Sequence, residues 1–154
     1  AYIPTTDVLL VFDVSDPSHP TQVGTPGLTM QLDAAKHGRY LYSVDVFKGL
    51  LVFDVSDPSR PKQLGSGDFL EGVNELEIAG DSLFVLTDSE GIQIHDLSQP
   101  TDLSPAATLD DPGYGLAIDI LGTLAVVVRG DGLQVLDLSD PLAPMILYDE
   151  QSPG

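Results

Sequence analysis

The chain contains no cysteine and few basic residues. Without cysteine it can have no disulfide, no thiolate nucleophile and no Cys-ligated zinc or iron–sulfur site. Six Lys and Arg side chains stand against 24 Asp and Glu, which gives a formal net charge of −18. This balance argues against nucleic acid and anionic membrane surfaces as partners, because both attract clusters of basic side chains.

Long apolar runs and helical periodicity are also missing. No run approaches the roughly eighteen residues that span a bilayer, and no basic-then-apolar leader is present, so we expect no membrane insertion. The chain begins at Ala1, as a processed or excised segment would. No window keeps a 3.6-residue period, which predicts little or no helix. With 154 residues, 42% of them apolar, the chain is long enough for one domain with a sizeable core.

A repeat of about 41 residues governs the chain. Residues 10–17 read LVFDVSDP, and the same eight letters return at 51–58. The motif returns with changes as QIHDLSQP at 93–100 and as QVLDLSDP at 134–141. Its central aspartate recurs after 41, 42 and 41 residues, a spacing too regular to be chance.

Each repeat contains short β-type segments separated by turn residues such as Gly-Asp and Ser-Glu-Gly. Segments such as 9–12 and 124–128 are apolar at every position, which predicts strands buried on both faces. The expected strands of the last two copies are 73–79, 83–87, 92–97, 106–109, 116–120, 124–128, 133–138 and 145–148.

Four-stranded units of this length, packed between similar neighbours, are typical of an all-β fold, the β-propeller. Residues 1–6 align with the second strand of a blade, so we expect the first blade to lack its inner strand. The uncovered edge indicates that upstream sequence is missing or that another chain supplies the strand, and the chain could be half of a larger ring. We therefore predict one propeller segment of about four blades, with approximate boundaries at 1–28, 29–70, 71–112 and 113–149 and a tail at 150–154.

The sequence at 51–58, with Pro61 and Gly65 after it, resembles the LVIVD repeat family. The third copy departs most, with His95 in the strand, Gln99 for aspartate and Leu103 in place of the second proline. The resemblance implies a β-propeller of secreted and cell-surface proteins of bacteria and archaea, usually with more than four blades. It brings no catalytic residues.

The Asp-x-Ser-Asp-Pro turn has two interpretations. Closely spaced carboxylates and hydroxyls could bind calcium. Alternatively, the Asp and Ser side chains accept backbone N–H groups and the proline fixes φ. We favour a structural turn, because all four copies share it and no glycine-centred twelve-residue calcium loop is present. The residues assigned to this motif are Asp13, Ser15, Asp16, Pro17, Asp54, Ser56, Asp57, Pro58, Asp96, Ser98, Pro100, Asp137, Ser139, Asp140 and Pro141.

Acidic residues on the expected inner strands form the second candidate site. Asp33, Glu77 and Asp119, with Glu75 beside them, would converge near the propeller axis. There they could hold a cation such as Ca²⁺ or a basic ligand. We favour the simpler interpretation that these side chains line a wet channel.

Other chemistry-bearing residues give weak signals. His19 and His37 fall in expected loops and His95 in a strand, and no pair has metal-ligand spacing. No serine lies in a nucleophile elbow, and no phosphate-binding glycine loop is present. Tyr114, between two glycines, could contact a ligand near the axis.

Together these features predict a non-catalytic scaffold, secreted or at the cell surface, without a cofactor. It would bind a protein or assemble with copies of itself through loops, rims and blade edges, and a partner strand could pair near residues 8–14. One alternative is a ligand- or calcium-binding propeller with an acidic axial site. Another is a fragment of a subunit of a larger complex. The acidity could keep a sheet-rich protein dispersed or reflect adaptation to high salt.

Overall fold

Four antiparallel sheets make up the chain, as the repeat predicts. The computed structural model describes residues 1–5, 8–24, 31–67, 72–88, 90–110 and 115–151. The first sheet has three strands and the other three have four each, and these described residues contain no helix. The all-β propeller prediction is therefore confirmed, and each sheet is a blade.

The strands of each blade follow one another in chain order. The first blade contains β1 (Tyr2–Pro4), β2 (Leu9–Asp13) and β3 (Thr21–Gly24). The second contains β4 (Gln31–His37), β5 (Tyr40–Asp45), β6 (Gly49–Asp54) and β7 (Lys62–Ser66). The third contains β8 (Val73–Ala79), β9 (Ser82–Thr87), β10 (Ile92–Asp96) and β11 (Ala107–Leu109). The fourth contains β12 (Gly115–Leu121), β13 (Leu124–Arg129), β14 (Gly132–Asp137) and β15 (Met145–Gln151).

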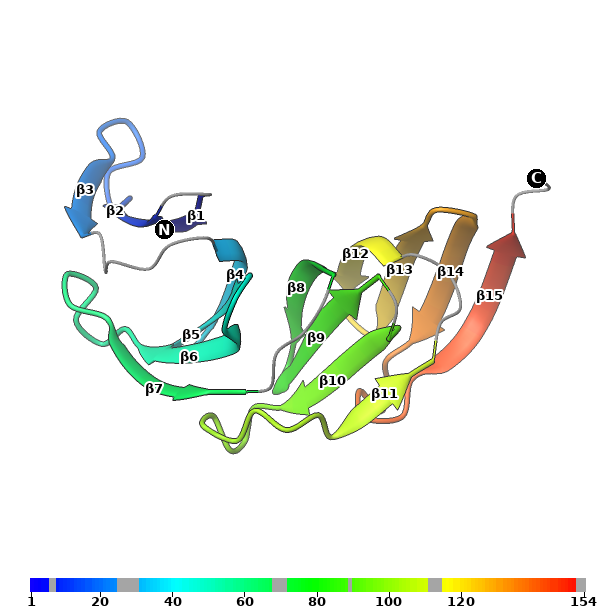
Figure 1. Ribbon diagram of the computed structural model, residues 1–154. Helices are drawn as coiled ribbons and strands as arrows, with labels where there is room; N and C mark the ends of the chain where they lie inside the picture. Colours follow the sequence, from blue (N-terminus) through cyan, green and yellow to red (C-terminus); the bar gives the residue numbers. More distant parts are fainter. Residues whose placement is uncertain (6–7, 25–30, 68–71, 89, 111–114, 152–154) are drawn as a thin grey trace.

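The blades stand side by side in an open arc (Figure 1). Each four-stranded blade pairs its strands in chain order, so β4, β8 and β12 are the inner strands and β7, β11 and β15 the outer ones. The inner strands β4, β8 and β12 are neighbours along the arc. The first and fourth blades form the two ends of the arc.

The first blade has no inner strand among the described residues, as the alignment of residues 1–6 predicts. β1 pairs with β2, with Tyr2 opposite Val11 and Pro4 opposite Leu9. β2 also pairs with β3, so it lies in the middle of the sheet. A strand added near residues 8–14 would therefore pair with the neighbouring β1, whose inner edge has no partner strand among the described residues.

Strand bounds agree with the expected segments to within one residue in the third and fourth blades, except at β15. That strand continues to Gln151, three residues past the expected end at Tyr148 and into the supposed tail. Its last residues keep pairing with β14, with Asp149 opposite Gln134 and Gln151 opposite Gly132.

Apolar side chains fill the spaces between neighbouring blades. Between the first and second blades, Leu9 packs with Leu51 and Phe53. Between the second and third, Tyr42 and Val52 pack in a cluster with residues of the third blade. The cluster between the third and fourth is built on Phe84, Leu86, Ile92, Ile94, Ile118, Ala125, Val127, Leu136 and Leu138. Stability therefore comes from contacts between adjacent blades.

Burial on both strand faces is confined to the two middle blades. Every residue of β9 is buried, and so is all of β6 except Asp54. In β13 the residues alternate, with Leu124, Val126 and Val128 exposed. In β2, Leu10 and Phe12 are only half-buried. The prediction of two-sided burial for 9–12 and 124–128 is wrong, because each strand lies in an end blade with one neighbour.

Candidate interaction surfaces

The four Asp-x-Ser turns share one geometry. In each, an Asp Oδ1 accepts the backbone N–H two residues on, at 2.9 Å for Asp13 and Asp54 and 2.8 Å for Asp137. Asp96 accepts the Ser98 N–H at 2.9 Å in the third copy. These are Asx turns, and they engage the carboxylates with their own backbone.

A second turn follows in each copy and contains the motif proline. The carbonyl oxygen of Asp16 accepts the N–H of His19 at 3.1 Å, and that of Asp57 accepts the N–H of Arg60 at 3.0 Å. Asp140 does the same for Ala143 at 3.0 Å, and Gln99 takes over this role for Asp102 at 2.9 Å. The Gln99 substitution in the third copy therefore preserves the backbone turn.

Hydrogen bonds lower the pKa of three of the Asp-x-Ser turn carboxylates, those of Asp13, Asp54 and Asp137. For Asp13 the largest cause is the backbone N–H of Ser15, and for Asp137 it is the Ser139 hydroxyl. For Asp54 the largest cause is the Arg39 guanidinium, which forms an ion pair with it. The lowered pKa values favour the ionised, hydrogen-bonded form of Asp13, Asp54 and Asp137.

The structure brings the axial acids together along the inner strands. A hollow of about 440 Å³ is lined by Asp33, Glu75 and Glu77, and another of about 510 Å³ by Glu75, Glu77 and Asp119. Burial raises the pKa of Glu77, and the charges of Glu75, Asp119 and Asp33 raise it further. Among the described side chains, no three His, Asp or Glu residues are placed to hold a metal ion.

Two of these acids bridge adjacent blades. The Oδ2 atom of Asp33 accepts the backbone N–H of Leu76 at 2.8 Å, from β4 to β8. The Oε2 atom of Glu75 accepts the N–H of Ile118 at 2.7 Å, from β8 to β12. In β12 the position that corresponds to Glu75 is held by Ala117. Ala117 pairs with Val128 of β13 in the same way that Glu75 pairs with Leu86 of β9. Asp33 and Glu75 therefore act as carboxylate-to-amide links along the concave side.

The histidines lie apart. His19 Nδ1 lies 2.9 Å from Asp16, and His37 Nε2 lies 3.1 Å from Asp81. His95 is fully buried, and burial lowers its pKa, while the backbone of Leu103 and Ser104 opposes that shift only in part. Tyr114 lies outside the described residues.

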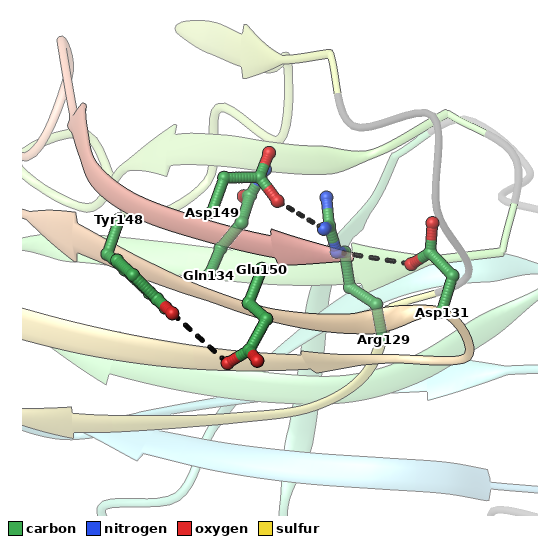
Figure 2. Close-up of polar contacts among 6 residues, drawn as sticks. All are labelled: Arg129, Asp131, Gln134, Tyr148, Asp149 and Glu150. Carbon is green, nitrogen blue, oxygen red and sulfur yellow. Dashed lines mark hydrogen bonds and ion pairs between the residues drawn. The ribbon is translucent and has the colours of Figure 1, made fainter. Parts of the chain in front are cut away.

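Arg129 was not singled out by the sequence patterns. Its buried guanidinium lies between Asp149 of β15, at 2.5 Å, and Asp131 of the β13–β14 turn, at 3.4 Å (Figure 2). The amide of Gln134 also donates to Asp149, at 3.1 Å. The hydrogen bond from Gln134, followed by the charge of Arg129, lowers the pKa of Asp149. The sequence held one signal for this contact. Arg129 ends its strand at the position where β5 ends with Asp45 and β9 ends with Thr87.

The trailing face is the side of the fourth blade turned away from the third. Residues opposite one another in neighbouring strands share a face, as do Val126, Val135 and Tyr148. Val126 is 42% exposed, although Phe84 and Tyr42 are fully buried at the same position in the third and second blades. The members of the trailing face are Leu124, Val126, Val128, Val135, Met145 and Tyr148.

The leading face is the side of the first blade turned away from the second. It consists of Ile3, Leu10, Phe12 and Val14. Ile3 and Val14 are each nearly half exposed, whereas Phe53 and Val55, the counterparts of Phe12 and Val14 in the second blade, are buried against the first. Both ends of the arc therefore carry apolar faces of the kind that is buried between blades.

The comparison with protein families agrees with this architecture. The LVIVD repeat family matches residues 1–25, 33–68 and 112–148. The chain belongs to the LVIVD repeat family. The third LVIVD copy, with His95 and Leu103, lies outside the matched segments but forms a four-stranded blade of the same order. Leu103 is buried in the cluster between the second and third blades.

Solved structures show the same fold at low sequence identity. This LVIVD chain is similar to the computationally designed Ika8 protein (12% identity, TM-score 0.70), covering 99% of this chain and 49% of that chain. It is also similar to the N-terminal domain of Nup159, with 14% sequence identity and a TM-score of 0.69. That match covers 99% of this chain and 41% of the Nup159 chain. The designed Ika4 protein matches with 13% sequence identity and a TM-score of 0.63. That match covers 80% of this chain and 73% of the Ika4 chain. The chain thus spans about half the length of Ika8, and no curated protein sequence matches it.

Proposed function

We propose that this LVIVD repeat chain is a non-catalytic β-propeller scaffold, secreted or displayed at a cell surface, that binds protein through its exposed blade faces. The observation that carries the proposal is the pair of apolar end faces. Positions that are fully buried between blades elsewhere, such as Phe84, are open at Val126. An exposed apolar sheet face of this extent is typical of an interaction surface.

Two further features support a scaffold. The recurrent Asp and Ser side chains, which could otherwise suggest catalysis or calcium binding, are engaged in turns. The axial carboxylates of Asp33 and Glu75 are bonded to backbone amides. Placement outside the cell is supported by the family resemblance.

The test combines light scattering after size exclusion with binding of a hydrophobic dye such as ANS. We expect the 16.3 kDa chain either to associate or, as a folded monomer, to bind the dye. Val126→Asp should weaken whichever response is seen, since it places a charge on the trailing face. Thr108→Asp is the matched control, because Thr108 is exposed on β11 and outside both end faces. A folded monomer that ignores the dye would contradict the proposal.

A further inference from the structure

We propose that the occupant of the two end faces is a second copy of this chain, joined head to tail so that the trailing face of each copy packs on the leading face of the other. This inference rests on the proposed function and names its partner. Two such junctions in one two-fold dimer would close the arc into a ring of eight blades.

The first argument is that the two faces match the chain's own blade interfaces. On the second and third blades, Tyr42 and Phe84 pack against the following blade. The corresponding residue of the fourth blade is Val126. The following blade contributes the positions of Phe53 and Leu136, which on the first blade are held by Phe12. Apart from the inner strand, which the first blade lacks among the described residues, the trailing and leading faces are therefore the two halves of an interface that the chain already forms three times.

The second argument comes from the inner-strand acids. Asp33 and Glu75 each need a backbone N–H on the inner strand of the following blade. The first blade has no inner strand among the described residues, so it offers no such amide to a blade packed on its leading face. The fourth blade has Ala117 at the bridging position, and an alanine there fits a junction whose following blade is the first blade.

The third argument is the curvature of the arc. The chain superposes over 99% of its length on 49% of the Ika8 chain, with a TM-score of 0.70. The four blades therefore follow the course of about half of a longer chain of the same fold.

Charge gives the dimer a distinctive salt dependence. Each copy carries a net charge of −18, so two copies repel one another at low ionic strength. At about 1 M salt the Debye length falls to roughly 3 Å and this repulsion is screened, while apolar packing persists. We expect the dimer fraction to rise with NaCl. For an interface built on ion pairs, the dimer fraction would instead fall with NaCl.

The experiment measures solution mass at 0.05 M and 1 M NaCl for the wild-type chain, Ile3→Asp, Val126→Asp and Thr108→Asp. Ile3 and Val126 are exposed in the single chain, so either aspartate should leave the fold intact, which circular dichroism checks. We expect dimers for wild type and Thr108→Asp, and monomers for the two face variants alone. An equimolar mixture of Ile3→Asp and Val126→Asp should regain dimers, because one junction then joins two unmodified faces.

Each other outcome overturns the inference. If only one of Ile3→Asp and Val126→Asp still formed dimers, two trailing faces or two leading faces would be packing on each other. Growth beyond two copies would mean that the ring does not close. A wild-type monomer that binds ANS at 1 M NaCl would exclude the second copy but keep the proposed scaffold, whereas a folded monomer that ignores the dye would reject both.

Discussion

His95 shows how one residue can give a blade its pH dependence. It occupies the strand position held by Phe12, Phe53 and Leu136 in the other copies, and its side chain is fully buried. The unfolded chain protonates this ring near pH 6.5, while burial lowers its pKa in the folded state. Protons therefore bind preferentially to the unfolded chain, and stability falls as pH drops below about 6.5.

We predict that His95→Phe removes this loss. Between pH 7.5 and 5.5 the free energy of unfolding should fall by about 1 kcal/mol less in the variant than in wild type. Urea titrations at the two pH values measure the difference. His19→Phe, at an exposed turn, should behave as wild type. Parallel pH profiles for wild type and His95→Phe would show that the buried ring does not carry the effect.

Glu77 should change stability with pH in the opposite direction to His95. Burial and the charges of Glu75, Asp119 and Asp33 raise its pKa, so the folded state binds its proton more tightly than the unfolded chain does. Its contribution to stability is therefore lost as pH rises through the folded pKa. Glu77→Gln should raise the melting temperature at pH 7, with the gain shrinking towards pH 4. Glu75→Gln serves as the contrast, because it weakens the link to Ile118 and should lower the melting temperature.

The sequence predicted which residues form strands better than it predicted what covers them. The period and the turn residues placed the blades and the missing inner strand, because hairpin geometry depends on local residues. Burial of 9–12 and 124–128 depends on a neighbouring blade, and an apolar strand looks the same with or without one. The link from Asp33 to Leu76 was also hidden, since it joins residues 43 positions apart.

At the level of single elements, β15 is the unusual strand. It has seven residues, whereas the outer strands β3, β7 and β11 have three to five. Its C-terminal half is held by Asp149, which accepts hydrogen bonds from Arg129 and Gln134 (Figure 2). Because the Arg129 guanidinium is buried, loss of this carboxylate leaves a buried charge with a weaker set of partners.

We predict that Asp149→Asn lowers the melting temperature and speeds amide exchange in residues 145–151 more than elsewhere. Hydrogen–deuterium exchange with peptide resolution measures this directly. Glu150→Gln is the matched control, since Glu150 is the next residue and bonds only the exposed Tyr148 among the contacts drawn. Equal effects from the two variants would indicate that lost charge on β15, and not the Arg129 contact, controls the strand.

For the whole molecule, the acidity and the apolar packing act against each other. Neighbouring blades bury apolar clusters, while 24 acidic side chains against six basic ones repel along the arc and on its concave side. Screening of that repulsion should stabilise the fold without any bound ion. A calcium site at Asp33, Glu77 and Asp119 would instead respond to calcium beyond its effect on ionic strength.

We predict equal rises in melting temperature in NaCl and CaCl₂ at matched ionic strength, with the largest change between about 0.01 M and 0.15 M, where the Debye length falls from roughly 30 Å to 8 Å. Val126→Asp should also show a rise, and because this variant should stay monomeric its rise measures stabilisation of the single chain apart from association. Glu77→Gln should show a smaller one, because a mutually repelling carboxylate has been removed. A larger rise in CaCl₂ that disappears in Asp119→Asn would contradict simple screening and place a cation among the axial acids.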